Sequence, residues 1–423
     1  MTTPIPQPFY DWRETRGADE REAAQLIRLQ TLIARAKTNP IHAERIGDAD
    51  IASLADLAKL PLLRKSDLIG MQAQTPPFAE LNLIEPGRMR HLYRSPGPIN
   101  DYDGHDDSHD PGGDGPDWWR VGRALYAAGF RPGDIVHNSF SYHFTPAGMM
   151  FDRGATHIGC AVFPAGTENT DLQAQAMGVF GATAYTGVPD FLPRLLEKAD
   201  ELGIDTRTLT RACVSAGPLF PSVREGLERR GIAVRQCYVI ADLGLVAYET
   251  PALAAMVIDE DIIVEIVRPG TGDPVPEGEV GEVVVTALSH HELPLIRLAI
   301  GDLSAIALGQ SPCGRTGRRI RGWLGRADQT VKVRGMFVRP EQVAQALRQC
   351  GLQGRARLVV GREGGRDTMT LHVEHDSDAE GLEGRIQAAI KTTFNLRSEV
   401  RIEPVGSLAN DGKVIEDRRD FRE

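Results

Sequence analysis

The feature that most constrains the fold is a regular alternation of helical stretches with short apolar runs between about residue 117 and residue 215. Apolar residues recur at helical spacing in the longer stretches, and the short runs between them are mostly apolar throughout. This alternation is typical of βαβ units, in which parallel strands form a sheet covered by helices. The stretches and runs are, in chain order, Trp118–Ala128, Asp134–Asn138, Asp171–Phe180, Thr183–Thr186, Leu192–Leu202 and Arg211–Ser215.

The segments on either side follow other patterns. Near the N-terminus, apolar residues such as Leu29 and Ile33 predict a helix over Asp19–Ala36. After residue 249, Asp261–Val267 and Glu279–Leu288 are rich in β-branched residues and are separated by a turn-forming Pro-Gly-Thr-Gly-Asp-Pro sequence. We expect these two segments to form a hairpin or meander rather than a crossover.

A further change begins near Gly325. Gln329–Val333 and Ala356–Val360 read as strands, and a helix is expected from Pro340. We therefore place a domain boundary at Gly325–Asp328. The predicted organisation is a large N-terminal α/β domain over residues 1–325 and a small α+β domain over residues 326–423.

Length, charge and cysteine content exclude several classes of protein. A chain of 423 residues exceeds one ordinary core, and its formal net charge of −10 argues against nucleic acid as a main partner. No apolar run approaches the roughly 20 residues that span a bilayer, and the N-terminus lacks the layout of a signal peptide. Five scattered cysteines without a CxxC pair fit reduced thiols. We expect a cytoplasmic protein that does not bind membranes.

The segment Asn100–Asp117 is polar, acidic and rich in glycine, and it includes His105 and His109. Carboxylates and imidazoles are metal ligands, but the segment lacks the residue order of a calcium-binding loop. Composition favours a solvated surface loop, so we predict a mobile or disordered segment.

Five segments taken together resemble the phenylacetate–CoA ligase branch of the adenylate-forming enzymes. They are Ser215–Pro218, which is similar to a G-A-E-P stretch; Gln236–Asp242, near a Y-G-x-[ST]-E motif; Leu293–Leu303, near P-x-I-R-Y-R-T-G-D-L; Gly325–Gly335, near G-R-x-D-x-x-[VL]-K-x-R-G; and Asn410–Arg418, a compressed form of the terminal lysine segment. Each is a weak signal alone, but five in the family's order are specific. The resemblance implies the adenylate-forming fold and an acid–CoA ligase that uses ATP, Mg²⁺ and coenzyme A. Related enzymes are often dimeric, so a homodimer is possible.

Lys413 occupies the position of the lysine that contacts the α-phosphate during adenylation in the family, although an Asn-Asp-Gly-Lys sequence alone would describe a surface turn. Asp302 matches the carboxylate that binds the ribose hydroxyls. The alternative for Gly301-Asp302 is a hairpin turn. Arg326 and Asp328 match the pair at which the family's C-terminal domain rotates, and a structural salt bridge is the alternative. The resemblance also makes Arg326 a predicted nucleotide contact.

The resemblance assigns further nucleotide contacts. Ala216, Gly217 and Pro218 match the backbone that cradles adenine, and Tyr238 matches the ring that stacks on it. Asp242 falls where the family places a glutamate that binds Mg²⁺. The alternative for Asp242 is a helix N-cap before Leu-Gly-Leu-Val-Ala-Tyr.

Other contacts implied by the resemblance involve phosphates and the acyl group. Lys332, Arg334 and Gly335 would face phosphates of the nucleotide or coenzyme A. Tyr142 and His143 lie on a segment similar to the family's aryl-binding wall, which suits an aromatic or short branched acid.

Phe140 and Phe144 lie on the same segment as these acyl-binding candidates, and core packing explains these two better.

The largest departure from the family is the phosphate loop, which is usually rich in Ser, Thr and Gly and ends in Gly-Lys-Pro. Here the sequence Arg94-Ser-Pro-Gly-Pro-Ile99 carries two prolines that lack N–H donors, and it has no Thr or Lys. Ser95 and Gly97 remain candidate phosphate contacts, and Arg94 supplies positive charge. The branch's Cys/His zinc motif is reduced to Cys313, so we expect no zinc.

Three functional hypotheses follow. The first is an acid–CoA ligase that forms an acyl-adenylate and then a thioester. The second retains adenylation but passes the acyl group to an acceptor other than coenzyme A. The third, favoured by the altered phosphate loop and by Ala241 in place of a hydroxyl residue, is an adenylation-impaired protein that binds nucleotide or acyl-CoA.

Overall fold

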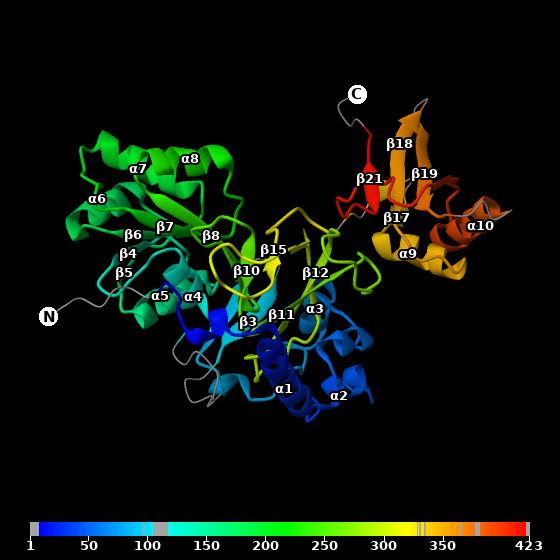
Figure 1. Ribbon diagram of the computed structural model, residues 1–423, viewed down its shortest axis with the longest axis horizontal. Helices are drawn as coiled ribbons and strands as arrows, with labels where there is room; N and C mark the ends of the chain where they lie inside the picture. Colours follow the sequence, from blue (N-terminus) through cyan, green and yellow to red (C-terminus); the bar gives the residue numbers. More distant parts are fainter. Residues whose placement is uncertain are drawn as a thin grey trace. The chain divides into compact units, whose positions relative to one another are not determined.

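The computed structural model describes residues 8–95, 98–104, 117–327, 329, 331–333, 336–363, 366–376 and 381–419. The chain divides into two compact units (Figure 1). The first comprises Met1–Val264, Val285–Leu298 and Ala307–Gly322, and the second comprises Glu265–Val284, Ala299–Ile306 and Trp323–Glu423. The domain division at residues 325 and 326 stays a prediction.

A nine-stranded sheet organises the first unit, with the strand order β14-β15-β10-β9-β8-β7-β6-β4-β5. The five strands from β5 to β8 are parallel, and β9, β10 and β15 extend the sheet with antiparallel pairs. This confirms the parallel sheet predicted from the sequence. The strands are β4 (Ile135–Asn138), β5 (Ala161–Pro164), β6 (Ala184–Gly187), β7 (Arg211–Val214), β8 (Ala233–Ile240), β9 (Gly244–Tyr248), β10 (Met256–Ile258), β14 (Ile306–Ala307) and β15 (Arg319–Ile320).

Helices cover both faces of the parallel strands. In Figure 1, α6, α7 and α8 lie on one side of these strands and α4 and α5 on the other. Apolar side chains of α6, α7 and α8, such as Met177, Leu195 and Leu227, pack against strand residues such as Val214 and Val234. These helices are α4 (Val121–Ala127), α5 (Ala147–Ile158), α6 (Thr170–Phe180), α7 (Phe191–Glu201) and α8 (Pro221–Arg229).

Helix α4 begins three residues later than the sequence predicted. The Asp117 carboxylate accepts hydrogen bonds from the N–H groups of Val121 (3.2 Å) and Gly122 (2.6 Å), and Arg120 has a left-handed backbone with φ of +65°. The side-chain cap therefore fixes the helix start after the two tryptophans rather than before them.

The N-terminal segment forms a smaller helical layer of the first unit. Leu29, Leu32 and Ile33 of α1 are buried in a cluster that includes Leu57 and Ile296. The helix predicted at residues 19–36 is confirmed. The elements of this layer are η1 (Trp12–Thr15), α1 (Ala18–Ala36), α2 (Pro40–Ile46), η2 (Leu54–Lys59), α3 (Lys65–Gln74) and η3 (Pro86–Arg88). No helix in the described ranges combines the length and apolar character needed to cross a bilayer.

Other strands before residue 305 form two further sheets. One has the order β1-β13-β12-β11, and the other is a hairpin of β2 and β3. The segments Asp261–Val267 and Glu279–Leu288 do form strands, as predicted. The strands are β1 (Leu63–Arg64), β2 (His91–Ser95), β3 (Ile99–Asp103), β11 (Ile262–Val267), β12 (Gly281–Ala287) and β13 (Leu298–Ser304).

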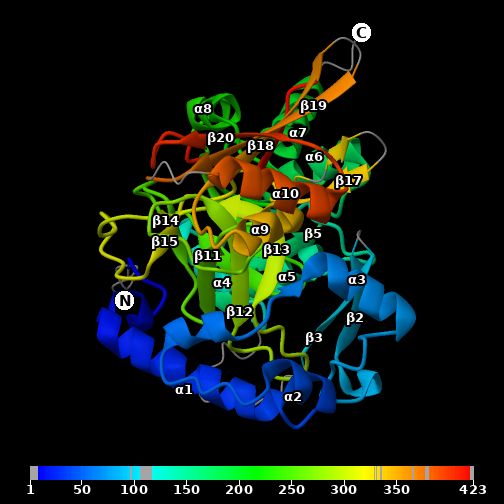
Figure 2. The same cartoon turned by 90° about the vertical axis from the view of Figure 1, so that its right-hand side faces the viewer.

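The C-terminal part of the second unit is an α+β layer. Strand β18 pairs antiparallel with β19, and two parallel partners extend the sheet to the order β20-β19-β18-β21. Helices α9 and α10 pack their apolar side chains, including Leu347 and Ile386, against this sheet (Figure 2). The elements are β16 (Val331–Val333), β17 (Met336–Val338), α9 (Pro340–Gln349), β18 (Ala356–Glu363), β19 (Arg366–Glu374), α10 (Leu382–Phe394), β20 (Glu399–Glu403) and β21 (Ile415–Asp417).

Several residues singled out in the sequence lie outside the described residues. They are Gly97, Asp328, Arg334, Gly335, most of the acidic segment including His105 and His109, and the side chain of Lys332. The prediction of a mobile segment is wrong for both ends of Asn100–Asp117, since Asn100–Asp103 belong to strand β3 and Asp117 is buried.

Candidate active site

The carboxyl ends of β7 and β8 carry two of the predicted nucleotide segments, at the edge where open α/β sheets bind ligands. Ser215 follows β7 and donates a hydrogen bond from Oγ to the Cys237 carbonyl at 2.8 Å, and Gln236 Nε2 donates to the Gly217 carbonyl at 2.8 Å. Ala216 has a φ of +63°, and the side chains of Ala216 and Pro218 are exposed. The loop is thus held in a fixed shape with an accessible surface.

Tyr238 lies near the end of β8, where the pairing with β9 shifts register between Tyr238 and Val239. Its side chain is half-buried, so part of the residue is accessible to solvent. A ring in that state offers surface on which a base can stack.

Asp242 follows β8 and is only 5% exposed, and its carboxylate forms an ion pair with the Lys65 ammonium at the start of α3. The Asp101 carboxyl, from β3, is also buried and faces Asp242, and its pKa is raised well above the usual range by burial and by the neighbouring Asp242 charge. Residues Gly244–Tyr248 form strand β9. The helix-cap interpretation of Asp242 is therefore wrong.

Ser95, predicted to contact phosphate, is buried at the end of β2 and donates a hydrogen bond from Oγ to the Ile99 carbonyl at 3.3 Å. Arg94 beside it is exposed, with Nη1 donating to Asn100 Oδ1 at 3.2 Å. The hydroxyl is therefore turned into the hairpin, whereas the guanidinium is accessible to an anion.

Asp302 and Arg326, two predicted nucleotide contacts, lie together in the second unit. Arg326 Nη1 donates to Asp302 Oδ1 at 2.7 Å, and Trp323 Nε1 donates to the same oxygen at 3.2 Å. Asp302 lies within β13 and forms an antiparallel bridge with Arg326, so the hairpin-turn alternative is wrong. The preceding Gly301 has a φ of +76°, a left-handed conformation that favours glycine.

Hydrogen bonds to two other segments of the second unit hold the turn that carries Lys413. Asn410 Oδ1 accepts the N–H of Val280 at 2.8 Å, and Gln329 Nε2 donates to the Gly412 carbonyl at 2.9 Å. Gly412 packs so closely that a Cβ would meet Leu303 at 3.1 Å. Since Leu303 follows Asp302 in the chain, the second unit places the Lys413 turn near the predicted ribose contact.

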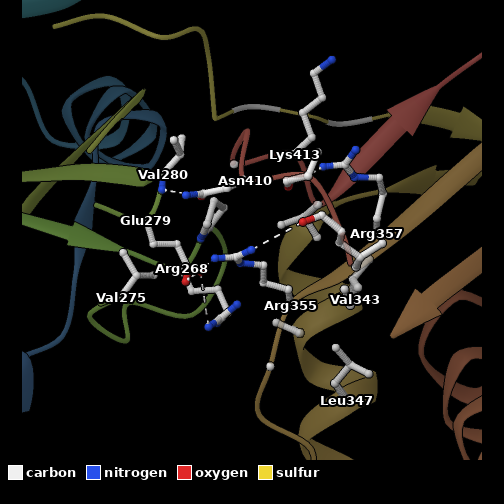
Figure 3. Close-up of a pocket in the computed structure, with 18 residues that line it drawn as sticks. Arg268, Val275, Glu279, Val280, Val343, Leu347, Arg355, Arg357, Asn410 and Lys413 are labelled. Carbon is white, nitrogen blue, oxygen red and sulfur yellow. Dashed lines mark hydrogen bonds and ion pairs between the residues drawn. The ribbon is translucent and has the colours of Figure 1, made fainter. Parts of the chain in front are cut away.

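A pocket lies beside this turn in the second unit (Figure 3). Val343 and Leu347 of α9 supply apolar walls, and Arg355 Nη2 forms an ion pair with Glu279 at 2.9 Å. The Lys413 side chain is exposed, and in Figure 3 it projects away from these residues. Its ammonium is thus accessible to a ligand.

The two predicted acyl contacts differ in their surroundings. Tyr142 Oη donates to Asp152 at 2.9 Å and accepts from Asn138 Nδ2 at 2.7 Å, and burial together with the Asp152 charge raises the pKa of its hydroxyl. His143 is exposed. The Tyr142 hydroxyl is therefore held by protein partners, and only His143 presents its polar atoms to solvent.

The two neighbouring phenylalanines also differ from each other. Phe140 stacks on Phe151 with ring centroids 4.4 Å apart and is buried, as expected for core packing. Phe144 is 79% exposed, so core packing is wrong for that residue.

Comparison with known proteins gives similarity over most of the chain. Residues 335–419 match the family described as the AMP-binding enzyme C-terminal domain. The phenylacetate–coenzyme A ligase of Aromatoleum evansii is 29% identical over 419 residues, which cover 92% of this chain and 91% of that protein. The chain is thus similar to phenylacetate–CoA ligases over nearly its whole length, and its C-terminal part matches the AMP-binding enzyme C-terminal domain.

Solved structures of a 2-hydroxyisobutyryl-CoA ligase are also similar to this chain. An open conformation in complex with 2-HIB-AMP and CoA gives a TM-score of 0.71 at 25% identity and covers 97% of this chain and 94% of that chain. The thioesterification state of the same ligase gives a TM-score of 0.69 at 25% identity and covers 99% and 94%. The adenylate-forming fold predicted from the sequence is confirmed.

Sequence reasoning missed three residues: Lys65 and Asp101 in the first unit, and Trp323 in the second. Lys65 and Asp101 become visible only through contacts between distant parts of the chain, such as the 177-residue separation between Lys65 and Asp242. One signal for Asp101 was its position two residues after the apolar Ile99, which puts both on the same face of a strand. A buried carboxylate on a strand is rare without a partner or ligand.

Proposed function

We propose that this protein is an ATP-dependent, AMP-forming acid–CoA ligase that activates an aromatic or short branched carboxylic acid. A carboxylate oxygen of the acid attacks the α-phosphorus of ATP, and pyrophosphate leaves. The thiol sulfur of coenzyme A then attacks the acyl carbon of the adenylate, AMP leaves, and the thiol proton passes to solvent. The observation that carries the proposal is the match over 97% of the chain to a ligase structure that holds both 2-HIB-AMP and CoA.

In this proposal Asp302 accepts hydrogen bonds from the ribose hydroxyls. Its carboxylate is 15% exposed and is oriented by Arg326 and Trp323, so an acceptor is in place before the nucleotide arrives. The Ser215–Pro218 loop and Tyr238 hold the adenine.

Lys413 stabilises the negative charge that develops at the α-phosphate during adenylation. Two observations support this role. Hydrogen bonds hold the backbone of the Lys413 turn, and the long side chain is exposed, so that its ammonium is able to reach a phosphate. Positively charged donors aimed at charge that develops in the transition state raise the rate more than they raise substrate affinity.

The residues present fit a magnesium ion at Asp242. One oxygen of that buried carboxylate, Oδ1, lacks a hydrogen-bond partner among the described residues. Mg²⁺ is commonly held by one or two carboxylates together with substrate phosphates and water, and when bound it neutralises phosphate charge. No group of three or more potential metal-binding side chains occurs in the described ranges, which agrees with a site completed by the nucleotide.

For the acyl group we propose contacts with Tyr142 and His143. For the C-terminal domain we propose rotation about Asp328 between an adenylating and a thioester-forming arrangement. The solved states of the 2-hydroxyisobutyryl-CoA ligase, one open and one in the thioesterification state, support such a movement. A homodimer stays a prediction that light scattering would measure.

The test is pyrophosphate release from ATP over a panel of aromatic and short branched acids, with and without coenzyme A. The proposal expects release that depends on the acid and acyl-CoA that forms only when coenzyme A is present. Release without any use of coenzyme A indicates another acceptor. Nucleotide binding without release, for every acid, indicates an adenylation-impaired protein.

A further inference from the structure

Two buried carboxylates in the first unit, Asp101 and Asp242, lie close enough to interact directly. Asp101 and Asp242 are 4% and 5% exposed. Asp101 Oδ2 and Asp242 Oδ1 each lack a hydrogen-bond partner among the described residues, although the two side chains lie close enough to interact directly. An ionised carboxylate only accepts hydrogen bonds, so two facing oxygens need a proton or a cation to bridge them.

The Lys65 ammonium supplies positive charge to one side of the pair. It contacts Asp242 through its other oxygen, Oδ2, and the Lys65 side chain is 30% exposed. The oxygens Asp101 Oδ2 and Asp242 Oδ1 are thus left to a proton or to a second cation.

The position is built by elements that fix both side chains. Asp101 lies on β3, and its neighbour Asn100 is held to α3 by two hydrogen bonds with Gln72, of 2.8 and 3.1 Å. Asp242 lies in the tight turn between β8, which ends at Ile240, and β9, which begins at Gly244. Asp101 is therefore positioned by a strand and Asp242 by a short, buried turn between two strands.

We propose that Asp101 is a second metal-binding carboxylate, which binds Mg²⁺ together with Asp242, and that Lys65 competes with the metal for Asp242. Asp242 is one methylene shorter than the glutamate expected at its position. A second carboxylate, from the β2–β3 hairpin, compensates for the shorter reach. This inference rests on the proposed function only for the source of the remaining ligands, which are nucleotide phosphate oxygens and water.

Manganese serves as the probe, because it accepts the same oxygen ligands and its free ion gives an electron paramagnetic resonance signal. Free Mn²⁺ is titrated with the full-length protein, with and without ATP, and the Mn²⁺ bound by the same concentration of ATP alone is subtracted. We expect one bound ion per chain in the presence of ATP. Asp101→Asn should weaken Mn²⁺ binding at least about 10-fold, because even a mutation of a residue that only supports a metal ligand typically lowers metal affinity by that much. Lys65→Met should strengthen it, because a competing cation is removed.

Asp67→Asn is the matched control, since it removes a carboxylate from an exposed position on the same helix as Lys65. It should bind Mn²⁺ as the parent protein does. The melting temperature of each variant separates loss of the site from loss of the fold.

Equal Mn²⁺ affinity in the parent protein and Asp101→Asn overturns the inference, as does a parent protein that binds no ion with ATP present. Unchanged affinity in Lys65→Met overturns the competition. None of these outcomes touches the ligase proposal, which fails instead when no acid supports pyrophosphate release.

Discussion

Replacing Asp302 by alanine tests the nucleotide site at the residue with the most specific role. The carboxylate is oriented by Arg326 at 2.7 Å and Trp323 at 3.2 Å, and the ribose would add hydrogen bonds to a charged acceptor. Hydrogen bonds to charged groups contribute about 1.5–3 kcal/mol each. The Arg326 side chain is 58% exposed, so the existing ion pair is screened by solvent and contributes at most about 1 kcal/mol.

The net loss of nucleotide binding energy is therefore about 3 kcal/mol, or roughly a 100-fold rise in the Kd for ATP and AMP. The unfolding free energy should change by only about 1–2 kcal/mol, because the substitution removes the screened pair with Arg326 and one hydrogen bond from the half-exposed Trp323. Isothermal titration calorimetry measures the affinity and urea unfolding measures the stability. Asp273→Asn, which removes an exposed carboxylate in the same unit, is the control.

Trp323 offers a second measurement of the same event. Its indole is 49% exposed and donates to Asp302, so a ribose that engages this carboxylate should alter the indole fluorescence. Trp323→Phe should remove the change without removing binding. Unaltered affinity in Asp302→Ala, with the parent protein binding nucleotide, would refute the placement of the ribose.

The remaining predictions concern Lys413, its turn and one thiol. Lys413→Ala should lower the adenylation rate roughly 10²–10³-fold. Thioester formation from a supplied acyl-adenylate should stay largely intact. Equal losses in pyrophosphate exchange and thioesterification would exclude the proposed role. Gly412→Ala should cost about 1–2 kcal/mol of unfolding free energy, because φ is +70° and a Cβ would lie 2.8 Å from Val280 Cγ1; a urea midpoint like that of the parent protein would contradict this packing. Burial raises the pKa of the Cys313 thiol, but hydrogen bonds from Ser311 and Arg315, among others, outweigh burial and lower it to about 7. Its iodoacetamide alkylation should rise as pH passes through about 7, whereas Cys160, whose pKa burial raises to about 11, should stay unreactive there; parallel pH profiles for the two peptides would show that the Cys313 contacts do not persist.

The sequence predicted the fold well because its signals are local. Helix spacing over residues 19–36 and the alternation of apolar runs from residue 117 each depend on neighbours in the chain. The start of α4 was misplaced because the Asp117 side chain, rather than helix propensity, determines it.

A site residue was predictable only where it lies within a short sequence motif. Asp302 and Arg326 were each found from a motif of their own, and the structure brings the two side chains together. The pairing of Asp101 with Asp242 joins residues 141 positions apart, and no local pattern encodes it. Core packing was the wrong prediction for Phe144, because an aromatic residue on an apolar segment is usually buried. The backbone of Phe144 is left-handed, with φ of +60°, and its side chain is exposed to solvent.

The central claim is that the acid is activated by forming a bond to the α-phosphorus of ATP. The most direct test supplies an acid labelled with oxygen-18 in its carboxylate, together with ATP and coenzyme A, and measures the label in the products by mass spectrometry. Because AMP leaves with the oxygen that bridged it to the acyl group, the account predicts one labelled oxygen in AMP and none in pyrophosphate. Acyl-CoA formed with unlabelled AMP, or with the label in orthophosphate or pyrophosphate, would contradict it.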